Sequence, residues 1–178
     1  DLNLLPKIPW DKEFKNSWQP GESHAEEVLK KFILNSITSY EKTRDRPDLN
    51  GVSHFSPYLH FGNLSPRLLY ERVKTSSACF LRQIFWREFA YHLMYHFPYT
   101  TNKPLRKEFM NFPWINDKIQ LQRWQKGLTG YPLVDAGMRE LWTTGWMHNR
   151  VRMVTGSFLV KDLLINWQEG AKWFFDTL

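Results

Sequence analysis

Apolar residues recur at helical spacing along most of the chain, and turn residues interrupt this pattern at intervals. Ser23, with Glu26 three residues later, has the spacing of a capping box, and the apolar positions that follow predict a first helix running to about Arg44. Further helices are predicted to begin near Ser56, Ser65, Ser77, Asp117, Pro132 and Met147. The last stretch is apolar over most of its circumference, which predicts a central, buried element.

Residues 1–20 contain three prolines and no sustained helical period, so we predict an irregular strap or linker there and a helical domain over residues 21–178. No segment alternates apolar and polar residues as a strand does, and no hairpin turn signal is present. The sequence therefore predicts an all-α fold, an irregular multi-helix bundle.

Composition narrows the class of partner and the compartment. Lys and Arg number 24 against 18 Asp and Glu, and this excess favours an anionic partner such as nucleic acid. Nine tryptophans indicate either stacking on flat molecules and electron transfer, or simply an aromatic-rich core. The single cysteine, Cys79, cannot form an internal disulfide, which favours a cytoplasmic location. No apolar run reaches the length that a bilayer needs, so no membrane association is expected.

One predicted helix carries a polar stripe. Gln83, Trp86, Arg87 and Ala90 lie at positions i, i+3, i+4 and i+7, so an amide, an indole and a guanidinium share one face. This face either borders a groove or is a solvated helix surface. We expect Ile84, Phe85 and Phe89, which lie beside it, to form the packing surface.

A second helix repeats the arrangement with Asn149, Arg152, Met153 and Gly156. Because the helix around it is apolar, we expect Asn149 and Arg152 to be buried. A buried guanidinium needs a carboxylate, a phosphate or a ligand as its partner. Glycine in the middle of a helix costs about 1 kcal/mol relative to alanine, which is tolerable where a ligand or another backbone comes close.

Two smaller features of the sequence could bind a ligand. Residues 50–56, NGVSHFS, supply consecutive backbone amides and two hydroxyls before a helix start, a plausible phosphate cradle that lacks the glycine spacing of known phosphate loops. His92 and His96 stand four apart on a helix, a geometry that can ligate a metal, but no Cys partner or HExxH arrangement accompanies them. We therefore expect no metal.

Three strings closely resemble the flavin-binding helical domain of the DNA photolyase and cryptochrome family. They are TGYPLVDAGMRELWTTGWMHNRVRMVTGSFLVKDLLINWQEG (residues 129–170), FWREF (85–89) and GVSHFSPYLHFGNLSPR (51–67). The resemblance covers nearly the whole chain and is greatest to bacterial photolyases that repair cyclobutane pyrimidine dimers. It implies a light-driven carbon–carbon lyase, a deoxyribodipyrimidine photolyase, in which fully reduced FAD passes an electron to a dimer flipped out of UV-damaged DNA.

The resemblance also assigns roles to individual residues. Flavin-binding positions are Tyr40, Val52, Ser53, His54, Phe55, Ser56, Phe80, Arg87, Asn149 and Arg152. DNA or lesion contacts are Arg44, Gln83, Trp86, Arg150 and Met153. Trp114 and Trp167 match the outer and middle members of a tryptophan relay that reduces the flavin, and Gln83 and Asn149 complete the expected catalytic set.

The sequence departs from the family pattern at several positions. Val52 stands where Thr is usual, His54 replaces a common Arg, and Gln83 replaces the Glu of dimer-repairing members, so it can hydrogen-bond but cannot ionise. The family's α/β antenna domain, which would hold a second chromophore, and a later flavin-contacting segment do not occur in these residues. We therefore expect this stretch alone to bind FAD poorly or not at all.

Two other functions stay open at this point. A cryptochrome-like blue-light photoreceptor would use the same flavin for signalling, and Gln83 favours it slightly. A helical nucleic-acid-binding module without a cofactor is supported only by charge and aromatic content. In either photolyase or cryptochrome, we expect a monomer.

Overall fold

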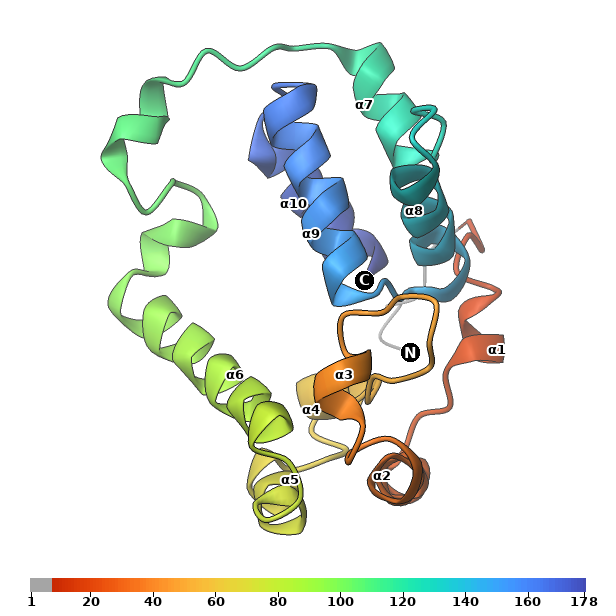
Figure 1. Cartoon of the computed structure of the whole chain (residues 1–178). Coiled ribbons are helices and arrows are strands. Elements are labelled where there is room, and N and C mark those ends of the chain that lie inside the picture. Colours follow the sequence, from red (N-terminus) through yellow and green to blue (C-terminus); the bar gives the residue numbers. More distant parts are fainter. Residues whose placement is uncertain (1–7) are drawn as a thin grey trace. The chain divides into compact units, whose positions relative to one another are not determined.

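The computed structural model describes residues 8–178, and every regular element in that range is helical (Figure 1). The prediction of an all-α fold is confirmed. The chain divides into two compact units, one formed by residues 19–110 and the other by residues up to Trp18 together with residues 111–178. No helix within residues 8–178 is both long enough and apolar enough to cross a bilayer.

The unit of residues 19–110, called the α2–α6 unit, follows the orange-to-green part of the chain in Figure 1. Ser65 and Ser77 begin α5 and α6 as predicted, because their side chains accept hydrogen bonds from the backbone N–H groups of Leu68 and Phe80. Its elements are α2 (Glu22–Asn35), α3 (Tyr40–Thr43), α4 (Ser56–His60), α5 (Pro66–Val73), α6 (Ala78–His96) and the 3₁₀ helix η1 (Pro98–Thr101). A second 3₁₀ helix, η2 (Lys107–Asn111), reaches the end of the unit.

The predicted first helix is wrong in two respects. Helix α2 begins at Glu22 with Gly21 as its N-cap, so Ser23 lies inside the helix and caps nothing. The helical pattern then breaks into a turn before α3. The hydroxyl of Ser39 donates to the carbonyl of Ser36 at 3.2 Å, which is the local side-chain bond that lets serine favour a turn over a helix.

An aromatic cluster forms the centre of the α2–α6 unit. Phe32 lies 4.8 Å from Phe80 and 5.4 Å from Phe55, measured between ring centroids, and Tyr40 lies 5.1 Å from Phe80. All four side chains are buried. Part of the aromatic content therefore fills a core, as one of the two sequence interpretations proposed.

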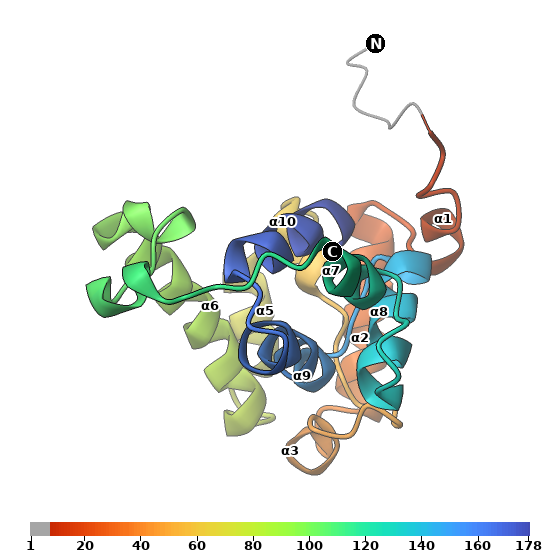
Figure 2. The ribbon, with the colours of Figure 1, turned by 90° about the horizontal axis from the view of Figure 1, so that it is seen from above.

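The other unit, called the α7–α10 unit, contains α1 (Phe14–Ser17), α7 (Lys118–Gln125), α8 (Pro132–Thr144), α9 (Asn149–Ser157), the π-helix η3 (Phe158–Asp162) and α10 (Trp167–Thr177). Helices α7 and α8 lie side by side in both views (Figures 1 and 2). Trp124 is fully buried between them and α9, and its indole N–H donates to the carbonyl of Thr155 at 3.0 Å.

The predicted irregular strap contains one short helix, α1, and residues 1–7 lie outside the described part of the chain. The strap lies on α8, because the indole N–H of Trp18 donates to the carbonyl of Thr144 at 2.7 Å. Gly145, which adopts φ 68° and ends α8, would place a Cβ 2.8 Å from the ring of Phe14. Gly137 permits a still closer approach of α8 to α9, since a Cβ there would collide with Val151.

Candidate functional site

The candidate phosphate loop, residues 51–56, turns sharply before α4. His54 has φ 54°, a left-handed conformation that non-glycine residues adopt rarely, and the turn directs Phe55 into the aromatic core. Position 51 also requires glycine, because a Cβ there would collide with Thr43. Val52, Ser53 and His54 are partly exposed and Ser56 is exposed. The binding of phosphate by this loop stays a prediction.

Three of the expected flavin contacts, Tyr40, Phe55 and Phe80, are packed against one another in the α2–α6 core. Burial raises the pKa of the Tyr40 hydroxyl, partly opposed by the nearby Arg44 guanidinium. That guanidinium lies 5.7 Å from the Tyr40 ring centroid. A ligand beside this cluster would meet ring edges and a neutral phenol.

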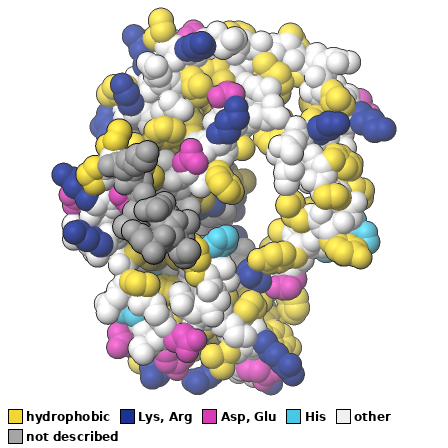
Figure 3. All heavy atoms as spheres, turned by 180° about the vertical axis from the view of Figure 1, so that it is seen from behind, with side chains coloured by type: hydrophobic (Ala, Val, Ile, Leu, Met, Phe, Trp, Pro, Cys, Tyr) yellow, Lys and Arg dark blue, Asp and Glu magenta, His cyan; other side chains and the backbone are white. Residues whose placement is uncertain are grey.

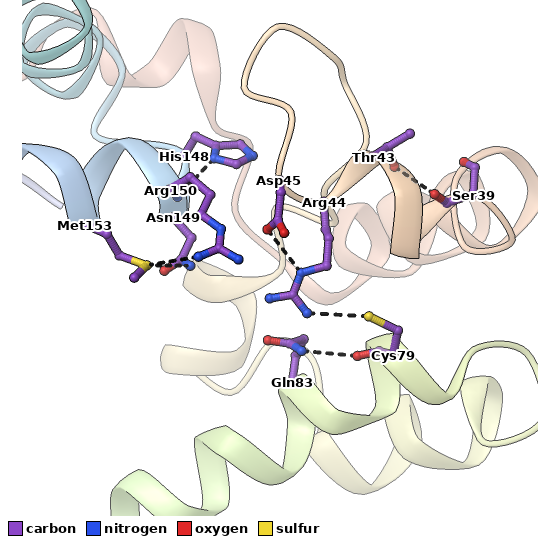
Figure 4. A network of polar contacts seen from close by, with 10 residues as sticks. All are labelled: Ser39, Thr43, Arg44, Asp45, Cys79, Gln83, His148, Asn149, Arg150 and Met153. Atoms are coloured by element: carbon purple, nitrogen blue, oxygen red, sulfur yellow. Dashed lines mark hydrogen bonds and ion pairs between the residues drawn. The ribbon is translucent and has the colours of Figure 1, made fainter.

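Arg44, an expected DNA contact, is held on both sides within the α2–α6 unit (Figure 4). Its Nη1 donates to Cys79 Sγ at 3.5 Å and its Nε to the carboxylate of Asp45 at 3.4 Å. The hydrogen bond to Cys79 raises the pKa of Arg44, so the group stays cationic. The contacts fix the direction of the guanidinium before any phosphate binds.

The residues of the α6 stripe lie on one continuous helix, but the side chains around the stripe are not packed as expected. Gln83 Nε2 donates to the carbonyl of Cys79 at 3.1 Å, which turns Oε1 away from its own helix as a free acceptor (Figure 4). Trp86 is 62% exposed. Of the residues expected to pack, Ile84 is buried as predicted, whereas Phe85 is 55% exposed and Phe89 47%, so the packing-surface prediction is wrong for these two.

Arg87, an expected flavin contact, is engaged within the α2–α6 unit. Its Nη2 donates to Tyr91 Oη at 3.1 Å and approaches the carbonyl of Leu59 at 3.5 Å, and its guanidinium lies 4.7 Å from the Tyr91 ring centroid. Its Nη1 pairs with Glu88 at 2.8 Å. These contacts join α6 to the end of α4, the helix that follows the candidate phosphate loop.

The α9 stripe begins at the first turn of that helix. His148 is the N-cap, and its Nδ1 accepts from the backbone N–H of Arg150 at 3.1 Å. Asn149 Nδ2 and Arg150 Nη1 each lie 3.8 Å from the thioether sulfur of Met153 (Figure 4). The expected burial of Asn149 is wrong, because the first turn of α9 leaves it exposed, and Met153 is 54% exposed.

Arg152 is the cation of the α9 stripe, and not all of its hydrogen-bond donors have partners. Its Nη2 donates to the carbonyl of Met147 at 3.3 Å, but its buried Nε has no hydrogen-bond partner among residues 8–178. Burial lowers the pKa of this guanidinium. Gly156, one turn later, would place a Cβ in open space. An unsatisfied buried donor is compatible with a polar acceptor on a ligand, and the binding of FAD by the α9 residues stays a prediction.

The two expected relay tryptophans are far apart in the sequence, but both lie near the same turn of the α7–α10 unit. The backbone N–H of Ile115 donates to the carbonyl of Leu164 at 2.8 Å, which brings the residue after Trp114 to the turn that precedes Trp167. Leu164 has φ 53°, and this left-handed residue lets the chain leave η3 and begin α10. The ring of Trp114 contacts Phe112, with centroids 4.4 Å apart.

A stack of three tryptophans was not foreseen from the sequence. Trp142 stacks on Trp173 with centroids 5.4 Å apart and on Trp10 with centroids 5.2 Å apart. The rings belong to α8, α10 and the segment before α1, which are far apart along the chain. Sequence spacing gave no signal for this cluster.

Basic side chains show no single concentration on the face drawn in Figure 3, where Lys and Arg are spread among acidic and apolar groups. No group of three or more His, Cys, Asp or Glu side chains within residues 8–178 is placed to hold a metal ion.

Residues 80–178 match the family described as the FAD binding domain of DNA photolyase. The chain therefore belongs to the FAD-binding domain family of DNA photolyases. This photolyase-family chain is 45% identical over 98% of its length to a deoxyribodipyrimidine photo-lyase of Agrobacterium fabrum, and covers 38% of that protein. It is 42% identical over 91% of its length to Cryptochrome-2 of Arabidopsis thaliana, covering 29% of that protein.

Among solved structures, it matches the crystal structure of a bacterial class III photolyase from Agrobacterium tumefaciens with a TM-score of 0.93 and 44% identity, over 99% of this chain and 38% of that one. The photolyase-family chain thus spans less than two fifths of the length of each of these three proteins.

Proposed function

We propose that the protein containing this chain is a flavin-dependent deoxyribodipyrimidine photolyase, which repairs cyclobutane pyrimidine dimers in UV-damaged DNA. The observation that carries the flavin part is Arg152, a partly buried guanidinium whose buried Nε has no hydrogen-bond partner among residues 8–178, together with the open space at Gly156 one turn later. The similarity to a photo-lyase over nearly the whole chain supports the DNA-repair part.

FAD bound in its fully reduced form would supply, on absorbing light, the electron that splits the dimer. The α9 residues then have distinct tasks. Arg152 donates a hydrogen bond to the cofactor and stabilises negative charge near it. Asn149, exposed at the first turn, can donate and accept, and the exposed thioether of Met153 offers an apolar surface to a flipped base.

The α6 residues have tasks that follow from their hydrogen bonds. Because Gln83 Nε2 is bonded to the carbonyl of Cys79, its Oε1 presents an acceptor for the N–H group of a pyrimidine. The exposed indole of Trp86 can stack on an extruded base. Arg87, through its contacts with Leu59 and Tyr91, positions α4 and the candidate phosphate loop.

Further parts of the proposal rest on the family resemblance and on composition. Arg44 and Arg150 would contact backbone phosphates, and Trp114 and Trp167 would pass electrons to the flavin. A second, antenna chromophore, a monomeric state and a cytoplasmic location belong to the same proposal, the last supported by the single cysteine.

A cryptochrome-like photoreceptor is the second candidate. The observation that favours it is Gln83, which cannot act as a proton donor in the way that a Glu can. The 42% identity to Cryptochrome-2 supports it as well. In that case the same flavin would serve signalling and the lesion would not be repaired.

The full-length protein, reduced and mixed with an oligonucleotide holding one thymine dimer, distinguishes the candidates. We expect dimers to disappear under blue light and to persist in the dark. Intact dimers after illumination of a flavin-loaded protein would favour the photoreceptor, and a protein without any flavin band would contradict both candidates.

Arg152→Ala tests the flavin assignment separately. In the full-length protein, we expect less FAD per protein after purification, measured by the visible absorption spectrum, because the donor and the positive charge are both lost. Arg139→Ala is a control outside the proposed flavin residues, since Arg139 donates to the carbonyl of Gly127 at 2.6 Å. Equal flavin content in Arg152→Ala and the wild type would show that α9 does not hold the cofactor.

A further inference from the structure

Two histidines near the end of α6 face each other. His92 and His96 lie on consecutive turns of this 19-residue helix, and their ring centroids are 4.3 Å apart with an interplanar angle of 56°. Both are exposed, and neither makes a hydrogen bond or ion pair within the described part of the chain. Their nitrogens are therefore available to a ligand from solvent.

We propose that His92 and His96 form a two-imidazole site for a divalent transition-metal ion of the Cu²⁺, Ni²⁺ or Zn²⁺ class. Two imidazole nitrogens bound to one tetrahedral ion, each at about 2.0–2.1 Å, lie roughly 3.3 Å apart. Ring centroids at 4.3 Å with tilted planes allow the facing ring edges to reach that separation by side-chain rotation alone. The helix supplies the spacing, because residues i and i+4 lie one above the other on its surface.

The donor type selects the ion. Imidazole nitrogen suits copper, nickel and zinc, whereas calcium and magnesium prefer oxygen ligands. Glu88 lies on the same face of α6 as the two histidines, four residues before His92. Its carboxylate pairs with Arg87 Nη1 at 2.8 Å. Glu88 precedes His96 by eight residues, a helical rise of about 12 Å, so these two side chains are too far apart to bind the same ion. Water completes the coordination in this proposal.

Neither histidine is one of the proposed flavin or DNA residues, although Phe89 contacts both His92 and Trp86. The expectation of no metal rested on the missing Cys partner and HExxH arrangement, and a two-imidazole site requires neither of them. A bound ion would link the last two turns of α6, whose final residue is His96, and so oppose fraying of that end of the helix.

Titration of the 178-residue chain, purified without a histidine tag, tests the proposal. We expect calorimetry with CuCl₂, NiCl₂ or ZnCl₂ to give one ion per chain. His92→Asn and His96→Asn should each weaken binding by at least about tenfold, because one imidazole no longer chelates. Circular dichroism should show unchanged helix content in both variants, because both side chains are exposed.

His60→Asn is the matched control, since His60 is exposed at the end of α4 without a histidine one turn away. It should bind the ion as the wild type does. Binding that survives the double variant His92→Asn/His96→Asn, or no saturable binding by the wild type, would overturn the proposal. Loss of binding in His60→Asn would also contradict it, because the site would then lie elsewhere.

Discussion

At the scale of single residues, neighbouring atoms decide what a side chain can do. Arg152 and Arg44 are both partly buried guanidiniums, yet Arg44 has Cys79 and Asp45 as partners while Nε of Arg152 has none. Arg152 is therefore the better indicator of a ligand, because a buried donor without a partner is costly. Arg44 is held in place before any ligand arrives.

Two helical glycines give a matched pair at this scale. Gly156→Ala should raise the free energy of unfolding by up to about 1 kcal/mol, because alanine restricts the unfolded chain and its Cβ meets open space. Gly137→Ala should lower it by roughly 1–3 kcal/mol, because its Cβ collides with Val151. Urea denaturation followed by circular dichroism measures both. Destabilisation by Gly156→Ala would mean that another group occupies that space.

Asp135 is a second residue whose surroundings predict a measurable effect. Its carboxylate is buried and accepts from the backbone N–H and hydroxyl of Thr129 and from the backbone N–H of Gly130, at 2.6–2.9 Å. Asp135→Asn replaces an acceptor by an N–H₂ group facing donors, so we expect a loss of about 1–3 kcal/mol in unfolding free energy. Asp117→Asn is a weaker comparison, since Asp117 Oδ1 caps α7 near the surface.

The same carboxylate predicts a pH dependence. Burial alone would raise the pKa of Asp135, but the hydrogen bonds from Thr129 and Gly130 outweigh it and lower the pKa. A pKa lowered by folding stabilises the native state above the unfolded value near 4, and this contribution is lost as pH falls through the folded value. Unfolding measured between pH 7 and pH 3 should show a smaller acid loss in Asp135→Asn than in the wild type.

At the scale of elements, caps and turns fix where the site helices begin. Ser77 accepts from the backbone N–H of Phe80 at 3.2 Å and sets the first turn of α6, which carries Gln83 two turns later. Leu164 adopts a left-handed conformation in the turn before α10, the helix that begins at Trp167. Changes at these positions act on a whole helix.

Ser77→Ala should lower the free energy of unfolding by about 1 kcal/mol, because α6 loses its N-cap acceptor. Ser76→Ala is the control, because Ser76 is exposed and makes its recorded bond through the backbone, to the carbonyl of Val73. Ser77→Asp should keep most of the stability, since aspartate also caps well. Equal stability of Ser77→Ala and Ser76→Ala would contradict the capping role.

At the scale of the whole molecule, the chain carries an excess of basic residues, and these are dispersed on the face drawn in Figure 3. The formal net charge is +6, yet the face in Figure 3 mixes Lys and Arg with Asp and Glu. A dispersed charge attracts DNA weakly and without sequence preference. In the proposed photolyase, specific recognition of a lesion would then come from individual side chains such as Trp86 and Met153.

We expect the chain to bind undamaged duplex DNA in the range of about 10⁻⁴–10⁻⁶ M at physiological salt, and less tightly as salt is raised. Fluorescence anisotropy of a labelled duplex at two salt concentrations measures this. An affinity that does not change with salt would show that phosphate contacts contribute little.

The sequence alone identified most helix starts and the two polar stripes. Ser56, Ser65, Ser77 and Pro132 predicted α4, α5, α6 and α8, because caps and proline act through the local backbone. Spacing at i, i+3, i+4 and i+7 was enough to place Gln83 with Trp86, and Asn149 with Arg152 and Met153, on common faces. The strings quoted above were enough to indicate the family.

Only the tertiary structure decided which of these side chains are satisfied. The lack of a partner for the buried Nε of Arg152, the exposure of Asn149 and the engagement of Arg87 with Leu59 and Tyr91 depend on neighbours that spacing along one helix does not specify. The Trp10, Trp142 and Trp173 stack is the clearest case, since its rings come from three segments. Contacts between distant segments arise from packing, and a local pattern carries no record of them.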